Sequence, residues 1–155
     1  MRINLLYCRA LAKLKELDPV KYEDVLLVLI GSTRNKEDDK LQKALAQEAA
    51  DLGVCESVRF EVNQPYGVLV KYMAESLIGL HSMWNEHFGI SIVEMMAAGL
   101  IVIAHNSGGP VMDIVVSATA STDETVAAKE LNLIKNTTGW LGLQYIRVCL
   151  HPLIL

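Results

Sequence analysis

The feature that most constrains the fold is a pair of continuous apolar runs, each followed at once by a turn. Residues 25–30 read Val-Leu-Leu-Val-Leu-Ile and end at Gly31, and residues 100–104 read Leu-Ile-Val-Ile-Ala before a polar, glycine-rich turn. A strand that is apolar at every position, and not only at every second one, is typical of a parallel sheet covered on both faces. The two runs therefore predict a parallel sheet with helices on either side.

Between these runs the chain alternates between helical and strand patterns with short connections. Apolar residues at helical spacing predict helices, and short apolar or β-branched stretches predict strands. Helices are expected at about residues 3–17, 38–52, 68–75 and 91–99, and further strands at 58–62 and 77–80. This alternation predicts an α/β fold with a doubly wound, Rossmann-like parallel sheet. Ligands of such sheets bind beyond the carboxyl ends of the strands.

Length and charge exclude several classes of function. The 155 residues fit one domain, and the formal net charge of −4, without a basic stripe, predicts no nucleic-acid partner. No apolar run reaches the roughly 20 residues of a membrane span, so no transmembrane segment is expected. From Ser117 the sequence becomes small, polar and acidic. We therefore expect one domain over residues 1–116 and a divergent tail over 117–155, whose structure the pattern does not define.

Two carboxylates flank the predicted start of the fourth helix. Glu86 and Glu94 have seven residues between them, and Phe88-Gly89 lies in that interval. A helix start presents unpaired N–H groups and the positive end of its dipole, which suits an anion such as a diphosphate. The carboxylates can accept hydrogen bonds from sugar hydroxyls. The pattern predicts a nucleotide-sugar site, with Gly89 allowing close approach of the ligand.

Simpler structural interpretations of the same residues remain open. Ser91 and Glu94 have the spacing of a capping box, in which Glu94 only closes the helix start. Glu86 alone is compatible with a solvated acid in a loop. Ala97 and Ala98 are small enough to let the helix pack closely on the sheet.

A second loop is expected beside the first. His105-Asn106-Ser107-Gly108-Gly109-Pro110 follows the last apolar run, and its glycines permit a tight turn whose Gly108 and Gly109 amides could face a ligand. His81 and His105, at predicted strand ends, are candidates to donate to a sugar or phosphate. Together with His87 they lack metal-ligand spacing, so we expect no metal.

Residues 11–116 resemble the C-terminal domain of retaining glycosyltransferases of family 4, which have two Rossmann-like domains in the arrangement called GT-B. The resemblance rests on residues 81–89 (His-Ser-Met-Trp-Asn-Glu-His-Phe-Gly), 103–110 (Ile-Ala-His-Asn-Ser-Gly-Gly-Pro) and 113–116 (Asp-Ile-Val-Val). Residues 27–36, which end Gly-Ser-Thr-Arg-Asn-Lys, agree with it as well. The similarity is greatest to the mannosyltransferases of N-glycan assembly.

The resemblance implies GDP-mannose as the donor substrate, without a further cofactor, and a dolichol-linked oligosaccharide as the acceptor, bound by an N-terminal domain. Glu86 would then hold hydroxyls of the transferred mannose, and Glu94 would accept from the ribose. The amides of Phe88, Gly89, Ile90 and Ser91 would face the sugar and diphosphate. Asn63 to Tyr66 would be candidates for the guanine.

The resemblance also implies a cellular setting. It places the chain at the cytosolic face of the endoplasmic reticulum membrane. Other mannosyltransferases of the same pathway are then candidate partners.

The resemblance is incomplete at both ends. Related enzymes have an Arg/Lys pair upstream of the first predicted helix, and Arg2, Lys13 and Lys15 do not occupy its position. Beyond Val116 the match decays, although residues 138–141 (Thr-Gly-Trp-Leu) are similar to a strand start of the family. We therefore expect a truncated domain with an exposed apolar sheet edge, inactive on its own.

Two other functions compete with a mannosyltransferase. The first is a truncated, non-catalytic nucleotide-sugar-binding or interaction fragment of such an enzyme. The second is a nucleotide-sugar epimerase of the same architecture, which the runs at 84–89 and 105–110 disfavour.

Overall fold

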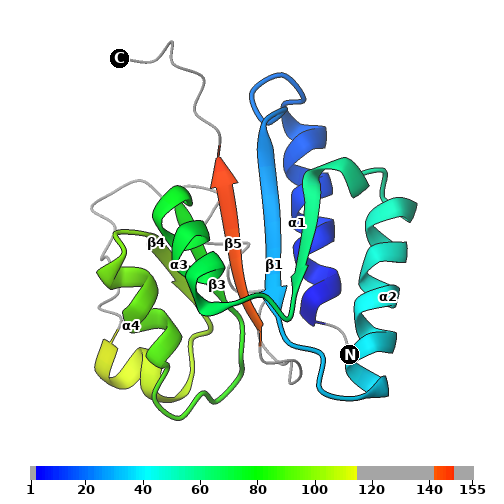
Figure 1. The fold of residues 1–155 in the computed structure, drawn as a ribbon. Coiled ribbons are helices and arrows are strands. Elements are labelled where there is room, and N and C mark those ends of the chain that lie inside the picture. Colours follow the sequence, from blue (N-terminus) through cyan, green and yellow to red (C-terminus); the bar gives the residue numbers. More distant parts are fainter. Residues whose placement is uncertain (1–2, 115–141, 149–155) are drawn as a thin grey trace.

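A computed structural model describes residues 3–114 and 142–148 of the chain. Five strands form one sheet in the order β2-β1-β5-β3-β4 (Figure 1). The pairs β1–β2 and β3–β4 are both parallel, in agreement with the prediction from the apolar runs. The strands are β1 (Val25–Gly31), β2 (Val58–Val62), β3 (Ile78–His81), β4 (Ile101–Ala104) and β5 (Gly142–Val148).

Helices cover both faces of this sheet, which confirms the doubly wound α/β fold. One pair packs on one face and the other pair on the opposite face (Figure 1). The first pair is α1 (Ile3–Leu17) and α2 (Lys36–Asp51); the second is α3 (Tyr66–Glu75) and α4 (Ile90–Ala97). Two short helical turns, Cys55–Ser57 and Pro110–Ile114, complete the described elements. None of the described helices is long and apolar enough to span a bilayer.

The strand β5 is the part of the sheet that the sequence did not predict. It lies in the middle, between β1 and β3, and is antiparallel to both (Figure 1). Position 145 pairs with Val28 on one side and with Gly79 on the other. Strands β1 and β3 each have a neighbour on both sides, so no open edge lies between the two parallel pairs, and the edge strands of the sheet are β2 and β4. The polar segment from Ser117 and the strand start expected at 138–141 lie outside the described residues.

Strand β1 separates two apolar cores. Leu27 and Leu29 face α1 and α2, whereas Val28 and Ile30 face α3 and α4. All four side chains are buried, as expected for a strand that is apolar at consecutive positions. Since both faces of β1 are covered, its register and depth are fixed by packing on either side.

Helix α4 approaches the sheet closely at one glycine. A Cβ on Gly79 of β3 would overlap the sulfur of Met95, a fully buried residue of α4. The prediction that Ala97 and Ala98 make this contact is wrong, because both are exposed. The small residue that permits close packing is on the strand and not on the helix, so the helix sequence alone could not reveal it.

Candidate functional site

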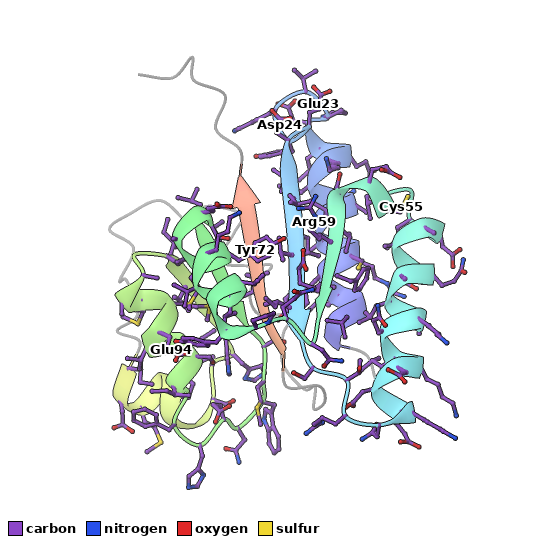
Figure 2. The ribbon with its side chains drawn as sticks, in the orientation of Figure 1. Glu23, Asp24, Cys55, Arg59, Tyr72 and Glu94 are labelled. Carbon is purple, nitrogen blue, oxygen red and sulfur yellow. The ribbon has the colours of Figure 1, made fainter. Side chains whose placement is uncertain are left out.

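The candidate site lies where the parallel strands end. In the view of Figure 2, Glu23 and Asp24 mark the amino end of β1 at the top, and the carboxyl ends of the parallel strands are at the opposite edge. The loops after β3 and β4 meet there, because the N–H of His105 donates to the carbonyl of His81 over 2.8 Å and extends the strand pairing. This placement agrees with the rule for ligands of open α/β sheets.

Helix α4 begins at this edge without a side-chain cap. Its N-cap is Gly89, in the left-handed region at φ 89°, and no side chain accepts from the first turn. The capping box of Ser91 and Glu94 is therefore a wrong prediction, since the helix starts earlier than that pattern requires. The N–H groups of Ile90 and Ser91 have no partner within the helix. No acidic residue lies in the first turn, so the positive end of the dipole is not compensated there.

Glu94 turns away from the helix start and toward helix α3. The Tyr66 hydroxyl, at the beginning of α3, donates to Glu94 Oε1 over a long 3.5 Å. Figure 2 shows Glu94 on α4. Because Glu94 does not cap its own helix, its carboxylate keeps most of its accepting capacity for another partner. The structure thus brings together two residues that the sequence had assigned to the nucleotide.

Glu86 is held inside its loop and is not a freely solvated acid. Its Oε1 accepts from the N–H of His87 over 2.8 Å, and its Oε2 lies 3.7 Å from His81 Nε2. The second distance is too long for a hydrogen bond, and an ion pair would require a protonated His81. The side chain is 20% exposed. Glu86 therefore presents an oriented carboxylate to the site edge.

The histidine next to Glu86 is buried at the end of β3. Burial lowers the pKa of His81 below its ordinary value of 6.5, and the Glu86 carboxylate opposes that shift only in part. Its Nδ1 has no hydrogen-bond partner among the described residues. A neutral His81 near pH 7 follows, because desolvation disfavours the charged form.

The glycine-rich loop after β4 docks against the Glu86 loop. The N–H of Gly109 donates to the carbonyl of Glu86 over 2.8 Å. A Cβ on Gly108 would overlap the same carbonyl, and one on Gly109 would overlap the carbonyl of His87. The Gly109 amide is thus used within the protein, which differs from the ligand-facing amide that the sequence suggested.

Two residues of this junction escaped the sequence interpretation. The Ser107 hydroxyl accepts from the N–H of Asn85 over 2.8 Å and lies 2.8 Å from His105 Nδ1. Asn85 has φ 55°, an uncommon conformation for a residue other than glycine. The only signal in the sequence was the residue type, since asparagine tolerates this region better than most residues. His105 itself is buried and does not face solvent.

Of the remaining candidates, Asn63 is hydrogen-bonded within the protein, whereas Phe88 is exposed. The Asn63 side chain accepts from the N–H of Thr33 and donates to its hydroxyl, so it ties the ends of β1 and β2 together. Phe88 is 57% exposed, beside the start of α4. Within residues 3–114 and 142–148, no group of three or more His, Cys, Asp or Glu side chains is placed to hold a metal ion.

Comparison with known proteins adds a family and several relatives. The family described as "Glycosyl transferases group 1" matches residues 5–135. The chain is similar to proteins named GDP-Man:Man(3)GlcNAc(2)-PP-Dol alpha-1,2-mannosyltransferase. The Homo sapiens protein is 54% identical over 112 residues, 72% of this chain and 23% of the relative. The Xenopus tropicalis protein is 51% identical over 107 residues, 69% of this chain and 21% of the relative.

A fungal relative extends the comparison. The Eremothecium gossypii protein of the same name is 42% identical over 116 residues, 74% of this chain and 19% of the relative. The chain therefore spans about a fifth to a quarter of the length of these curated relatives. No solved structure matches it significantly.

Proposed function

The chain belongs to the glycosyl transferases group 1 family, and from this premise we propose that it provides the GDP-mannose site of an α-1,2-mannosyl transfer to a dolichol-linked oligosaccharide. The names of its relatives supply the donor, the linkage and the acceptor. The observation that carries the proposal is the uncapped start of α4 with a carboxylate on either side of it in the sequence.

Each part of the donor has a matching group at this edge. The amides of Ile90 and Ser91 at the start of α4 would bind the diphosphate, because N–H groups and the helix dipole favour anions. Glu86, oriented by the N–H of His87, would accept from hydroxyls of the mannose. Glu94, with Tyr66 beside it, would accept from the ribose hydroxyls. Phe88 and Gly89 would line the path between sugar and phosphate.

The chemistry follows from this placement. Transfer breaks the bond between the mannose anomeric carbon and the diphosphate oxygen, and it forms a bond from the same carbon to an acceptor hydroxyl. Negative charge develops on the departing diphosphate, so donors already aimed at it stabilise the transition state more than the ground state. We assign Glu86 and Glu94 to binding and not to nucleophilic attack.

The proposal also includes the acceptor substrate and the cellular location of the reaction. Because the relatives are named for a dolichol-linked acceptor, we propose that the reaction takes place at the endoplasmic reticulum membrane, on its cytosolic face. Other mannosyltransferases that act on the same lipid-linked oligosaccharide would be its neighbours there.

Calorimetric titration of the full chain tests the donor site. We expect saturable binding of GDP-mannose and GDP, and weaker binding of UDP-glucose by at least tenfold. Glu94→Ala should weaken GDP and GDP-mannose alike, since both carry the ribose. Glu86→Ala should weaken GDP-mannose only, since GDP lacks the mannose.

A matched control and a contradicting result complete this test. Glu37→Ala removes an acid from the first turn of α2, a helix start to which no part of the donor is assigned, and should leave all three affinities unchanged. Equal affinity for UDP-glucose and GDP-mannose, or no binding by a folded chain, would contradict the proposed donor.

A further inference from the structure

We propose that His105 is a positioning residue for Glu86, which it orients through the hydroxyl of Ser107 and the backbone of Asn85. The inference rests on the proposed donor site, because it assigns a role in sugar binding to a buried side chain. His105 is 5% exposed, so a donor cannot reach its ring.

The hydrogen bonds form a short chain from the buried ring to the Glu86 loop. The N–H of Asn85 donates to Ser107 Oγ over 2.8 Å, and Ser107 Oγ lies 2.8 Å from His105 Nδ1. Because the hydroxyl oxygen accepts from Asn85, its own proton is available to His105 Nδ1. The hydroxyl oxygen has a second lone pair, so this bond can run in either direction. We take Nδ1 as the acceptor, with the ring proton on Nε2.

The chain ends on backbone that needs support. Asn85 has a positive φ of 55°, which a residue with a Cβ adopts only when its surroundings favour it. Glu86 is the next residue, and its carbonyl accepts from the N–H of Gly109. Hydrogen bonds thus hold the backbone on both sides of Glu86. One runs from the N–H of Asn85 to Ser107, and the other from the N–H of Gly109 to the Glu86 carbonyl.

The other ring nitrogen of His105, Nε2, makes no hydrogen bond to a described residue that would explain a histidine at this position. His105 Nε2 is buried and has no partner among the described residues. An unpaired buried polar atom is unfavourable, and an apolar side chain would avoid it. The atom that the ring contributes at this position is therefore Nδ1, which lies within hydrogen-bond distance of Ser107.

Two substitutions separate the Nδ1 acceptor from the bulk of the ring. His105→Asn keeps an oxygen close to the place of Nδ1, whereas His105→Gln places its oxygen near Nε2. We expect the ratio of GDP to GDP-mannose dissociation constants to fall at least fivefold in His105→Ala, His105→Gln and Ser107→Ala. His105→Asn should keep most of the wild-type ratio, and GDP affinity should change less than twofold in every variant.

Asn106→Ala is the matched control, since Asn106 lies between the two residues in the same loop and is exposed. It should keep the wild-type ratio. The positioning role is overturned if His105→Ala keeps the wild-type preference for GDP-mannose, or if the Asn variant loses it to the same extent as the Gln variant. Loss of GDP and GDP-mannose binding in equal measure would also overturn it.

A measurement without ligand keeps this inference separate from the proposed function. In the free chain, nitrogen chemical shifts should show His105 protonated at Nε2, and the Asn85 amide should exchange at least tenfold faster in His105→Ala and Ser107→Ala. If the wild-type chain binds no nucleotide, the proposed function fails and this exchange decides the structural link alone. Unchanged Asn85 exchange overturns the link, and Ser107→Ala serves if His105→Ala does not fold.

Discussion

The starts of α2 and α4 differ in how their unpaired N–H groups are satisfied. At α2, Asn35 Oδ1 accepts from the N–H of Asp38, and three acidic residues occupy the first turn. At α4, the N-cap is a glycine, no side chain accepts, and the first turn has no acid. Both helices begin at the carboxyl edge of the sheet. The first helix start contributes stability, whereas the second leaves its N–H groups for an anion.

The loops around these helix starts differ in the same way. After β1, side chains make the connections, as when Arg34 pairs with Asp38 at 3.1 Å and Asn63 bonds Thr33. After β3 and β4, backbone also packs directly on backbone, and glycines at 108 and 109 are required by the lack of space. This close backbone contact, together with the bond from Asn85 to the Ser107 hydroxyl, fixes the Glu86 loop.

The largest expected effect comes from filling that backbone contact. Gly108→Ala adds a Cβ that overlaps the Glu86 carbonyl, at a residue with φ 62°. Strain at this φ together with a disrupted loop hydrogen bond should cost about 3 kcal/mol of unfolding free energy. Denaturant unfolding measures it.

Gly53→Ala is the control for this substitution. Gly53 has a similar φ of 68° but open space around it, so the cost should be about 1 kcal/mol, from strain alone. If the two variants lose equal stability, the backbone of Gly108 is not packed closely against the Glu86 carbonyl.

The next effect tests whether the start of α4 is kept open for an anion. Ser91→Asp gives α4 an acid in its first turn, as α2 already has. Unfolding free energy should rise by about 0.5 kcal/mol through the helix dipole, while GDP-mannose affinity falls about tenfold or more through repulsion of the diphosphate. Ser91→Asn has nearly the same shape without charge and should change affinity little. Equal losses in the two variants would indicate a steric cause.

The difference between these regions explains what the sequence could predict. Strands β1, β3 and β4 were predictable because each contains a short apolar run, as in Val25–Gly31, whereas β2 (Val58–Val62) was predictable from the alternation of its apolar residues with Arg59 and Glu61. The two loops of the site, after β3 and β4, were predictable because each follows a strand with an apolar run. The start of α4 was not, since Ser91 and Glu94 have the local pattern of a capping box, and the left-handed Gly89 overrides it.

Contacts between distant segments lie beyond any local pattern. Strand β5 pairs with β1 and β3, from which it is separated by sixty residues or more, and its position depends on which strands leave space. The bond of Ser107 to Asn85 likewise joins two loops. Neither shows in periodicity or spacing, because each is decided by tertiary packing.

A smaller effect is expected at the closed helix start. Asn35→Ala removes the cap of α2 and should lower unfolding free energy by about 1 kcal/mol, because the Asp38 amide loses its acceptor. Donor affinity should stay within twofold, as this helix start has no ligand role in the comparison. Calorimetric titration beside denaturant unfolding checks both. A fall in affinity without loss of stability would mean that α2 and not α4 meets the anion.

The last prediction separates the two regions by pH. Burial keeps the His81 pKa below 6.5, so as pH falls through 6.5 the unfolded chain binds a proton that the folded chain does not, and stability declines. Asp38 acts in a lower range. Hydrogen bonds from Arg34 lower the pKa of Asp38 below 3.8, so its contribution is lost only as pH falls through that lower value.

Unfolding free energies at pH 7.5 and 5.5 should therefore differ less in His81→Asn than in the wild type, whereas Asp38→Asn should leave this difference unchanged. His87→Asn, at an exposed histidine of the same loop, should keep the wild-type difference. If His81→Asn also keeps the wild-type difference between the two pH values, His81 is not the source of the acid sensitivity. The Glu86 carboxylate would then raise the pKa of His81 by as much as burial lowers it.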